Sequence, residues 1–509
     1  MTGNHAAERS RGIPRAAVVV VLVATIIQLL MGARGPLDGD ETLYWEWARH
    51  LAWGYFDHPP GVAFLIRIGA GLFGVNALGV RSMTTLANLG GALITITLAR
   101  RLGGDRAALR AALIISCMPM LTNWLMLATP DTALFFTGMG VLLLVDNALR
   151  QRPASAASLC WWLLAGVMLG LAALAKELAI LLPVGMLLAC LTHKGLRPRL
   201  AEPGPYLACF VATVMIVPLV LWNRSHGWVL LQFVLHRGLG AEPGSAAGRE
   251  LEYLAGQVAI VSPLLFGLLA VTVWRTLRDG RDPRRHLLAI SALVTFGWFA
   301  IAALRHPMEV NWPMMVYPPA AILLAADPGR QVSRRWLTAS LVLGGSIVLL
   351  LYLDTAIRVL PFPRLDDPVR RGHGWKEVAG RVDAARGATG PGATWVAANR
   401  FQDASQLAFY LHGHPFVFSL NIESRANQYD FWPGFAERAR PGDGLIVVLD
   451  DSAEAGIASS LAPYFTRVSA GERIVAGGAH PTLVPKRIWM LEGWQGSWPA
   501  ARRPGVTHW

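Results

Sequence analysis

Residues 16–47 read AAVVVVLVATIIQLLMGARGPLDGDETLYWEW. The first half is an uninterrupted apolar run, and the second half places acidic and aromatic residues directly after it. Arg9, Arg11 and Arg15 precede the run, and an excess of basic residues marks the cytoplasmic side of a membrane helix. The stretch therefore predicts a membrane-spanning helix with a cytoplasmic N-terminus, followed by an extracytoplasmic acidic loop over residues 34–80.

The composition predicts a polytopic membrane protein. Hydrophobic residues make up 53% of the 509 residues and charged residues only 16%, which excludes an ordinary soluble domain. The net charge of +13 could suggest nucleic-acid binding, but the basic residues lie in short clusters between apolar spans. A cleaved signal peptide is the alternative for the first span. It fits less well, because no Ala-x-Ala-like site follows Met31 and many more apolar spans come later.

About eleven helical spans can be drawn, each near the length that a bilayer core requires. Basic clusters, which include Arg101, Arg150 and Arg284, fall in alternate loops and are predicted to lie on the cytoplasmic side. Gly61–Phe73 is apolar but short, which is typical of a helix that lies in the interface. The predicted spans are residues 16–33, 82–99, 108–127, 132–149, 158–175, 178–192, 206–222, 252–274, 287–304, 313–326 and 336–353.

The sequence predicts two domains, a transmembrane domain over residues 1–353 and a small α/β domain over 354–509. The second shows a soluble pattern of helices and strands, and an odd number of spans places it outside the cytoplasm. Helices are expected at Trp375–Ala385 and Asp403–Leu411, and strands at Thr394–Ala398, Phe416–Leu420 and Leu445–Leu449. The polar residues between Asn399 and Asp430 suggest a cap over the site that helps to choose the acceptor; a plain structural core is the alternative.

Several short motifs appear in a fixed order along the first 330 residues. Together they resemble the bacterial family 39/83 membrane glycosyltransferases, relatives of the protein O-mannosyltransferases, the lipid A aminoarabinose transferases and the rhizobial lipopolysaccharide galacturonosyltransferases. The motifs are Asp40-Glu41-x-x-Tyr44-x-x-Trp47, Tyr55-Phe56-Asp57-His58-Pro59-Pro60, Arg81, Thr129-Pro130-Asp131, Leu174-Ala175-Lys176 and Asn311-Trp312-Pro313-x-x-x-Tyr317.

This resemblance implies a GT-C fold, a polyprenyl-phosphate sugar donor and transfer on the extracytoplasmic face. One departure concerns the substrates: the aminoarabinose transferases have Lys-Pro-Pro where this chain has His58-Pro59-Pro60. The resemblance therefore does not extend to the same sugar or acceptor.

A sugar on a lipid phosphate already has an activated leaving group. The enzyme must deprotonate an acceptor hydroxyl, stabilise oxocarbenium-like charge and hold the departing phosphate. With the motifs matched, Asp40 is the expected general base and Glu41 its helper, and Asp131 is either a further catalytic acid or the N-cap of its helix. The expected phosphate ligands are Lys176, Arg81 and His58, and the expected sugar or acceptor contacts are Asp57, Tyr44, Asn311, Trp312 and Tyr317.

Helix-end cations can also simply reach the membrane interface, which is the alternative for Lys176. Tryptophans such as Trp45, Trp47 and Trp162 are expected to form an interfacial belt. The four cysteines have no Cys-x-x-Cys spacing, and His412 with His414 lacks an obvious acidic partner. No metal site is therefore predicted, no cofactor is required by these motifs, and the need for a divalent cation is left open.

The sequence thus predicts a multi-pass glycosyltransferase of the bacterial inner membrane. It would move one sugar from a polyprenyl-phosphate carrier to an extracytoplasmic lipid or polysaccharide by direct inverting displacement, with no nucleic-acid partner. A transporter or flippase of lipid-linked sugars is the alternative, because intramembrane charges also mark transport pathways. A transporter would usually place its charges near mid-bilayer and show paired halves. Here the charges gather at one face and no halves repeat.

Overall fold

The computed structural model describes residues 13–240, 243–327, 333–357, 359–360, 372–388, 394–422, 425–477 and 483–498. The chain divides into two compact units. Unit 1 comprises Met1–Met31, Ser82–Pro218 and Arg237–Tyr352, and unit 2 comprises Gly32–Arg81, Leu219–His236 and Leu353–Trp509. Unit 2 therefore contains the predicted C-terminal domain together with the acidic segment that follows the first span.

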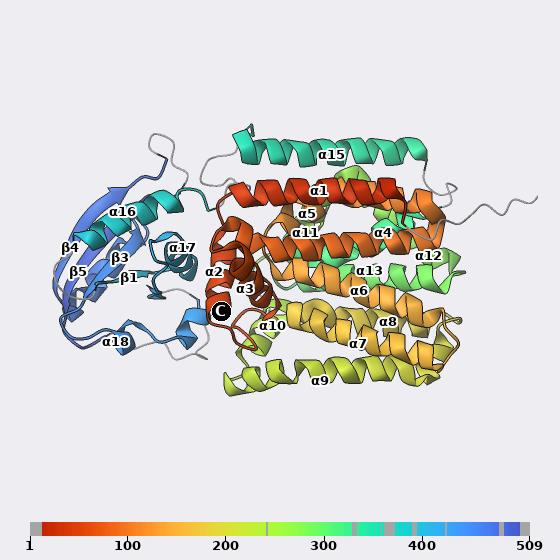
Figure 1. Ribbon diagram of the computed structural model, residues 1–509, viewed down its shortest axis with the longest axis horizontal. Coiled ribbons are helices and arrows are strands. Elements are labelled where there is room, and N and C mark those ends of the chain that lie inside the picture. Colours follow the sequence, from red (N-terminus) through yellow and green to blue (C-terminus); the bar gives the residue numbers. More distant parts are fainter. Residues whose placement is uncertain are drawn as a thin grey trace, which may run out of the picture. The chain divides into compact units, whose positions relative to one another are not determined.

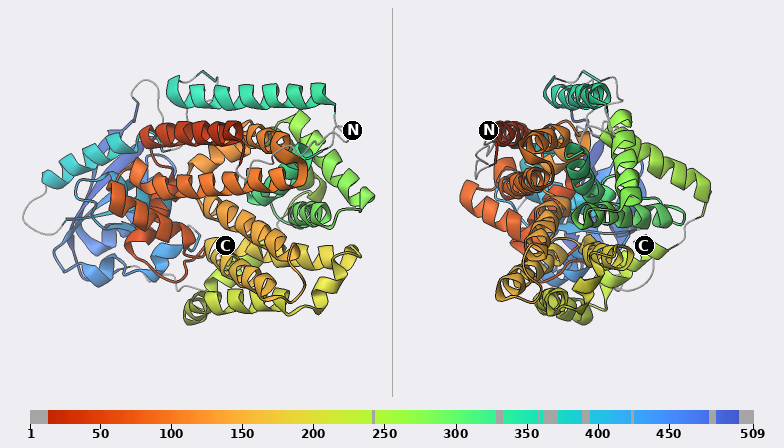
Figure 2. Two further views of the ribbon diagram at one scale, coloured as in Figure 1. Left: turned by 45° about the vertical axis from the view of Figure 1, so that its right-hand side comes forward. Right: turned by 90° about the vertical axis from the view of Figure 1, so that its right-hand side faces the viewer.

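The long helices of unit 1 run side by side in Figures 1 and 2. Among the described residues, seven helices are long and apolar enough to cross a membrane, or eight if α11 and α12 form one span. The helices before residue 360 are α1 (Arg15–Arg34), α2 (Gly39–Arg49), α3 (Gly61–Phe73), α4 (Ala77–Ser116), α5 (Pro119–Asn123), α6 (Pro130–Leu149), α7 (Ala156–Ala175), α8 (Leu181–Thr192), α9 (Pro203–Ser225), α10 (Val229–Leu239), α11 (Ala246–Val261), α12 (Pro263–Asp279), α13 (Pro283–Ala303), α14 (Tyr317–Ala325) and α15 (Arg334–Ile357). Short 3₁₀ turns lie at Trp124–Met126, Glu177–Ile180, Arg197–Ala201 and Trp312–Val316.

The predicted spans coincide with these helices and the 3₁₀ turns between them, but two breaks inside predicted spans were not predicted. The span 82–99 and the start of the span 108–127 both lie on α4 and separate at Gly104 (φ 76°), a conformation that favours glycine, whereas the break between α4 and α5 at residues 117–118 was not expected. The prediction of one helix over 252–274 is wrong. α11 and α12 meet at 105°, because Ser262 has φ 81° and Pro263 has no N–H to continue the helical ladder.

α4 and α6 approach closely through glycines of α4. A Cβ atom on Gly90 would lie 2.6 Å from the ring of Phe136, and one on Gly91 would lie 2.7 Å from the ring of Phe135. Small residues of this kind let the backbones of membrane helices approach each other. The glycines thereby fix the position of α6, which carries Asp131 in its first turn.

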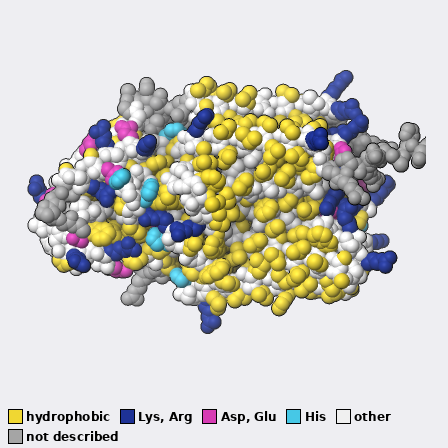
Figure 3. All heavy atoms as spheres, in the orientation of Figure 1, with side chains coloured by type: hydrophobic (Ala, Val, Ile, Leu, Met, Phe, Trp, Pro, Cys, Tyr) yellow, Lys and Arg dark blue, Asp and Glu magenta, His cyan; other side chains and the backbone are white. Residues whose placement is uncertain are grey.

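The loops predicted to be cytoplasmic meet at one end of unit 1. The Asp146 carboxylate pairs with Arg101 at 2.7 Å and Arg150 at 2.8 Å, and Arg284 lies 3.9 Å away. These three arginines come from three of the predicted basic loops. Figure 3 shows Lys and Arg side chains gathered at the right-hand end of the apolar helical surface. The prediction that the loops of Arg101, Arg150 and Arg284 lie at the same end of the helices is therefore confirmed.

Unit 2 contains a five-stranded sheet in the order β2-β1-β3-β5-β4. β1 (Thr394–Ala398) is parallel to β2 (Val417–Ser419) and to β3 (Gly444–Asp450), whereas β3 is antiparallel to β5 (Lys486–Trp494), and β5 to β4 (Phe465–Ile474). Val396 pairs in register with Val417 and Ile446, so one apolar row crosses the parallel strands. The helices of this region are α16 (Trp375–Gly387), α17 (Phe401–Tyr410), α18 (Phe435–Arg438) and α19 (Ala455–Leu461), with 3₁₀ turns at Gln428–Phe431 and Ala462–Tyr464.

All five elements predicted in this region are present, while β4 and β5 were not predicted. Phe401–Tyr410 begins at the carboxyl end of β1 and packs against α2. This places the end of the parallel strands close to the acidic helix within unit 2. The expected interfacial belt is partly wrong: the side chains of Trp45, Trp47 and Trp162 are at most 3% exposed and belong to the protein interior.

Candidate functional site

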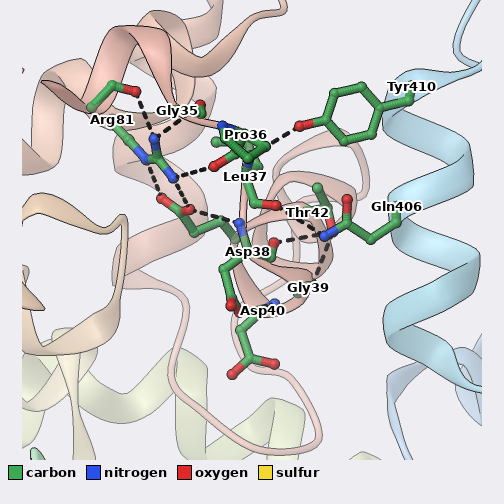
Figure 4. Close-up of polar contacts among 12 residues, drawn as sticks. Gly35, Pro36, Leu37, Asp38, Gly39, Asp40, Thr42, Arg81, Gln406 and Tyr410 are labelled. Carbon is green, nitrogen blue, oxygen red and sulfur yellow. Dashed lines mark hydrogen bonds and ion pairs between the residues drawn. The ribbon is translucent and has the colours of Figure 1, made fainter. Parts of the chain in front are cut away.

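The acidic motif forms the first turn of α2. Asp38 is the N-cap and accepts a hydrogen bond from the Asp40 amide at 3.0 Å, and the Glu41 carboxylate accepts one from the Asp38 amide at 2.9 Å. These two bonds form a capping box, which satisfies amides that a helix start leaves without partners. The Asp40 side chain has no part in it, and its carboxylate points away from the labelled residues around Arg81 in Figure 4.

Glu41 and Arg81 form a buried bidentate ion pair. The Arg81 Nε donates to Glu41 Oε1 at 2.7 Å, and Nη2 donates to Oε2. Nη1 donates to the carbonyls of Gly32 and Gly35, and Nη2 also donates to that of Pro36. All five guanidinium N–H groups thus have acceptors within the protein. We therefore revise the expected phosphate role of Arg81: the side chain holds Glu41 and the turn before α2.

Replacing Arg81 by alanine is expected to destabilise the protein by about 3–5 kcal/mol, because the Glu41 carboxylate would be left buried without its counter-charge. Both side chains are at most 3% exposed, so water cannot take over the role of the guanidinium. The measurement is thermal unfolding of the purified protein in detergent. Arg81→Ala with a wild-type midpoint and a raised KM for the donor would instead restore the phosphate role.

The linker that leads into α2 is held by α17. The Leu37 amide donates to the Tyr410 hydroxyl at 2.9 Å, and the Leu37 carbonyl accepts from the Gln406 side chain at 3.0 Å. Both contacts are visible in Figure 4. Two C-terminal side chains therefore fix the backbone just before Asp38, and with it the direction in which α2 begins.

Asp40 belongs to a cluster of charged groups that the sequence predicted only in part. Asp57 pairs with Arg425 at 2.8 Å, and the Arg425 guanidinium lies 4.9 Å from the centre of the Phe401 ring. Part of the Asp40 residue is exposed, but the protein atoms packed around its carboxyl desolvate it. This desolvation, together with the charges of Asp38 and Asp57, raises the pKa of Asp40 to about 7, whereas Arg425 and His58 lower it.

Arg425 was not predicted. It lies on the segment after β2, 368 residues beyond Asp57 in the chain, and only the general density of polar residues in that segment pointed to it. The same segment supplies Gln428, whose Oε1 accepts from the Phe56 amide at 2.8 Å. Arg425 and Gln428, which come from the C-terminal part of the chain, thus contact Asp57 and Phe56 beside Asp40.

Aromatic side chains lie beside this cluster. The rings of Trp47 and Tyr55 stack with centroids 4.4 Å apart, and Tyr44 lies 4.9 Å from Trp47 and 6.2 Å from the His58 ring. Two predicted contact residues, Tyr44 and His58, are therefore next to each other. The ring of Tyr44 is largely buried, so its face is not open for a sugar ring to stack on it.

A second group of predicted residues meets in unit 1. The Asp131 carboxylate accepts from the Lys176 ammonium at 2.6 Å, from the Asn311 amide at 2.9 Å and from the Trp124 indole at 3.4 Å. Asp131 and Lys176 are each 2% exposed. The carboxylate is thus fully engaged by donors, and the ammonium keeps two further N–H groups for other acceptors.

The alternative of Asp131 as an N-cap is wrong. Thr129 occupies that position, and Asp131 lies in the first turn of α6 with its side chain bonded to other elements. Lys176 ends α7, and Asn311 directly precedes the 3₁₀ turn Trp312–Val316. Three segments far apart in the sequence therefore meet at one carboxylate.

The last two predicted contact residues lie near that turn. The Arg237 guanidinium is 5.7 Å from the centre of the Trp312 ring, and the Tyr317 hydroxyl donates to Gln257. Gln257 in turn donates to the Val310 carbonyl at 2.9 Å. Tyr317 is 1% exposed, so its hydroxyl orients the segment around Asn311. Among the described residues, no three His, Cys, Asp or Glu side chains are placed to hold a metal ion.

Comparison with known proteins identifies the class of fold. The family model described as dolichyl-phosphate-mannose-protein mannosyltransferase matches residues 57–222. Two crystal structures of ArnT from Cupriavidus metallidurans superpose with TM-scores of 0.67 in the apo state and 0.66 with undecaprenyl phosphate bound. The apo structure is 18% identical in sequence, and the match covers 93% of this chain and 97% of that one.

The chain has the fold of the GT-C membrane glycosyltransferases and is similar in sequence to members of that class. This confirms the resemblance that the motifs indicated, and with it a multi-span membrane protein of GT-C fold. Lipid A galacturonosyltransferase RgtD of Rhizobium johnstonii is 27% identical over 314 residues, which is 61% of this chain and 65% of that protein. The undecaprenyl phosphate-alpha-4-amino-4-deoxy-L-arabinose arabinosyl transferase of Pseudomonas paraeruginosa is 27% identical over 65% of this chain and 60% of its own length. The matches thus span under two thirds of either GT-C relative.

Proposed function

We propose that the chain is a glycosyltransferase that moves one sugar from a polyprenyl-phosphate carrier to an extracytoplasmic glycolipid or polysaccharide. The observation that carries the proposal is the placement of Asp40: its carboxylate takes no part in the capping box at the start of α2 and lies near the Asp57–Arg425 ion pair, where its pKa is raised to about 7. A general base works best when its pKa lies near the operating pH. The similarity to the lipid A galacturonosyltransferase RgtD and to the undecaprenyl-phosphate-dependent arabinosyl transferase, and the undecaprenyl phosphate bound to ArnT, support this donor class and an acceptor of the lipid A type.

In the proposed reaction the acceptor hydroxyl attacks the anomeric carbon of the sugar while Asp40 takes the hydroxyl proton. The bond from the acceptor oxygen to the sugar forms, the bond to the carrier phosphate breaks, and the electron pair leaves with the phosphate. One displacement of this kind inverts the anomeric centre. Lys176 is held by Asp131, which also accepts from Asn311, and it stabilises the departing phosphate through a charge-assisted hydrogen bond.

The remaining residues have supporting roles in this proposal. Arg425 orients Asp57 and adjusts the pKa of Asp40, while Glu41 and Arg81 shape the turn that presents Asp40. His58 and Tyr44 contact the sugar or its phosphate. Asn311 and Trp312 contact the donor or acceptor, and Tyr317 positions them through Gln257. We place about eleven spans in the bacterial inner membrane, with the N-terminus in the cytoplasm and residues 354–509 outside it, where they help to select the acceptor.

The direct test is transfer by the purified protein in lipid nanodiscs. Undecaprenyl phosphate bearing a uronic acid or an amino sugar is supplied with lipid A, and mass spectrometry follows the gain of one sugar by the acceptor. One donor class should give product that depends on Asp40. Movement of the intact lipid-linked sugar between leaflets without product would support transport in its place.

Transfer is expected to rise as the pH increases through about 7, because only the deprotonated Asp40 can accept a proton. Arg425 lowers the pKa of Asp40, so Arg425→Gln should move the rise to higher pH, and Arg425→Lys should keep it close to that of the wild type. Arg438→Gln removes an exposed cation elsewhere in unit 2 and is the matched control. A pH profile that Arg425→Gln leaves unchanged would contradict the assigned role of Arg425.

A further inference from the structure

A polar cavity lies in unit 1, at the end where the basic loops meet. It has a volume of about 740 Å³ and lies between α4, the end of α14 and α15. Its charged lining consists of Arg106, Arg110, Arg285, Arg334 and Asp327. None of these side chains belongs to the proposed active site, so the cavity is a feature that sugar transfer does not explain.

Two of the arginines form the framework of the cavity. Arg110 donates to the carbonyl of Ala325 at 3.5 Å, and Arg285 donates to that of Ala326 at 2.8 Å. These carbonyls lie at the C-terminal end of α14, where helices leave acceptors without partners. The Arg285 Nε also lies 3.9 Å from the Asp282 carboxylate. The framework therefore keeps cationic groups fixed in the cavity wall.

The other two arginines supply charge at the surface. Arg106 on α4 and Arg334 at the start of α15 are both exposed. Among the lining residues that the structure describes, these four arginines oppose one carboxylate, that of Asp327. The rest of the wall is largely apolar and includes Leu102, Leu324, Leu337 and Leu341. The cavity thus combines an excess of guanidinium groups with a hydrocarbon surface.

Tryptophans mark the depth of this site in the membrane. Trp336 follows the two arginines that begin α15 and is 58% exposed. Trp274 on α12 is 53% exposed, and the guanidinium of Arg278 lies 4.9 Å from its ring centre. Exposed tryptophans beside arginines are typical of the level at which lipid headgroups meet the hydrocarbon core. An anionic group that reaches this cavity is therefore most readily supplied by the bilayer itself.

We propose that the cavity binds the phosphate group of an anionic membrane phospholipid. Guanidinium groups bind phosphate oxygens through paired, charge-assisted hydrogen bonds, and basic pockets between membrane helices bind anionic headgroups. The volume falls within the range of about 300–1,000 Å³ that is usual for small-molecule sites, and the leucines contact the start of the acyl chains. Bound lipid would join α4 and α14 to α15 and stabilise unit 1.

The test uses the double variant Arg106→Gln/Arg334→Gln, which removes charge from the cavity and leaves the two framework arginines in place. Its matched control is Arg152→Gln/Lys194→Gln, which makes the same charge change at exposed positions outside the cavity. Thermal unfolding is measured in nanodiscs of phosphatidylcholine alone and in nanodiscs that also contain phosphatidylglycerol. Native mass spectrometry of detergent-purified protein counts the phosphatidylglycerol that remains bound.

Phosphatidylglycerol should raise the unfolding midpoint of the wild type and of the control variant, and it should remain bound to both. The cavity variant should lose most of this shift and bind phosphatidylglycerol at least about tenfold more weakly, since one lost charge-assisted bond is worth about a factor of ten or more. Equal stabilisation of wild type and cavity variant would overturn the proposal. Inorganic phosphate that stabilises the wild type as well as the lipid does would also overturn it, by showing a site for soluble anions.

Discussion

Asp40→Asn is expected to lower the turnover of sugar transfer by about 10²–10⁴-fold, the usual loss when a general base is removed. The amide keeps the shape of the side chain but cannot take the proton of the acceptor hydroxyl. The capping box uses the Asp40 backbone amide and the side chains of Asp38 and Glu41, so α2 should form as before. The rate is measured with lipid-linked donor in nanodiscs, and thermal unfolding reports whether the fold is intact.

Asp38→Asn is the matched control, because it removes the same charge two residues earlier. Asparagine is as good an N-cap as aspartate, so the helix start should be preserved. The negative charge of Asp38 helps to raise the pKa of Asp40, and its loss should move the pH profile to lower pH with little change in the maximal rate. Near-normal turnover of a folded Asp40→Asn protein would remove Asp40 from the role of base.

Lys176→Ala is expected to raise the KM for the lipid-linked donor by about one to two orders of magnitude, since a charge-assisted bond contributes about 1.5–3 kcal/mol. It should also destabilise unit 1 by about 3–5 kcal/mol, because Asp131 would remain buried without its cation. Kinetics with varied donor concentration measure the first effect, and thermal unfolding measures the second. Lys176→Arg should partly restore both.

A double variant separates the two roles of Lys176. Asp131→Leu/Lys176→Met replaces the buried pair by apolar side chains of similar size, a change that often restores stability. We expect a folded protein that still uses the donor poorly. If the double variant recovers donor use together with stability, the pair is purely structural and the phosphate is bound elsewhere.

The sequence predicted the membrane helices well because their signal is local. A run of apolar residues is long enough by itself to indicate a span, and the arginines that meet at Asp146 could be grouped from loop alternation alone. The break at Ser262–Pro263 was missed because the mean hydropathy of a window of residues does not change where the chain changes direction. β4 was missed because it is an edge strand, on which Arg467, Glu472 and Arg473 interrupt the apolar pattern.

For the candidate site, the sequence could name residues but not their partners. Asp131, Lys176 and Asn311 were expected at a site, and the structure adds that one carboxylate joins them. Arg81 looked like a phosphate ligand because its burial against Glu41 cannot be seen in a motif. Arg425 could not be paired with Asp57 at all, since contacts across hundreds of residues leave no local pattern.

The hydrogen bonds that Tyr410 and Gln406 of α17 make with Leu37 have a consequence for the order of events during synthesis. Its amide and carbonyl are held by Tyr410 and Gln406, which leave the ribosome roughly 20 seconds or more after Leu37 at the usual rate of about 5–20 residues per second. α1 and α2 are therefore synthesised well before the hydrogen bonds that fix the backbone at Leu37 can form. In the proposed function, a nascent chain therefore becomes active only after Gln406 and Tyr410 have been translated and unit 2 has folded.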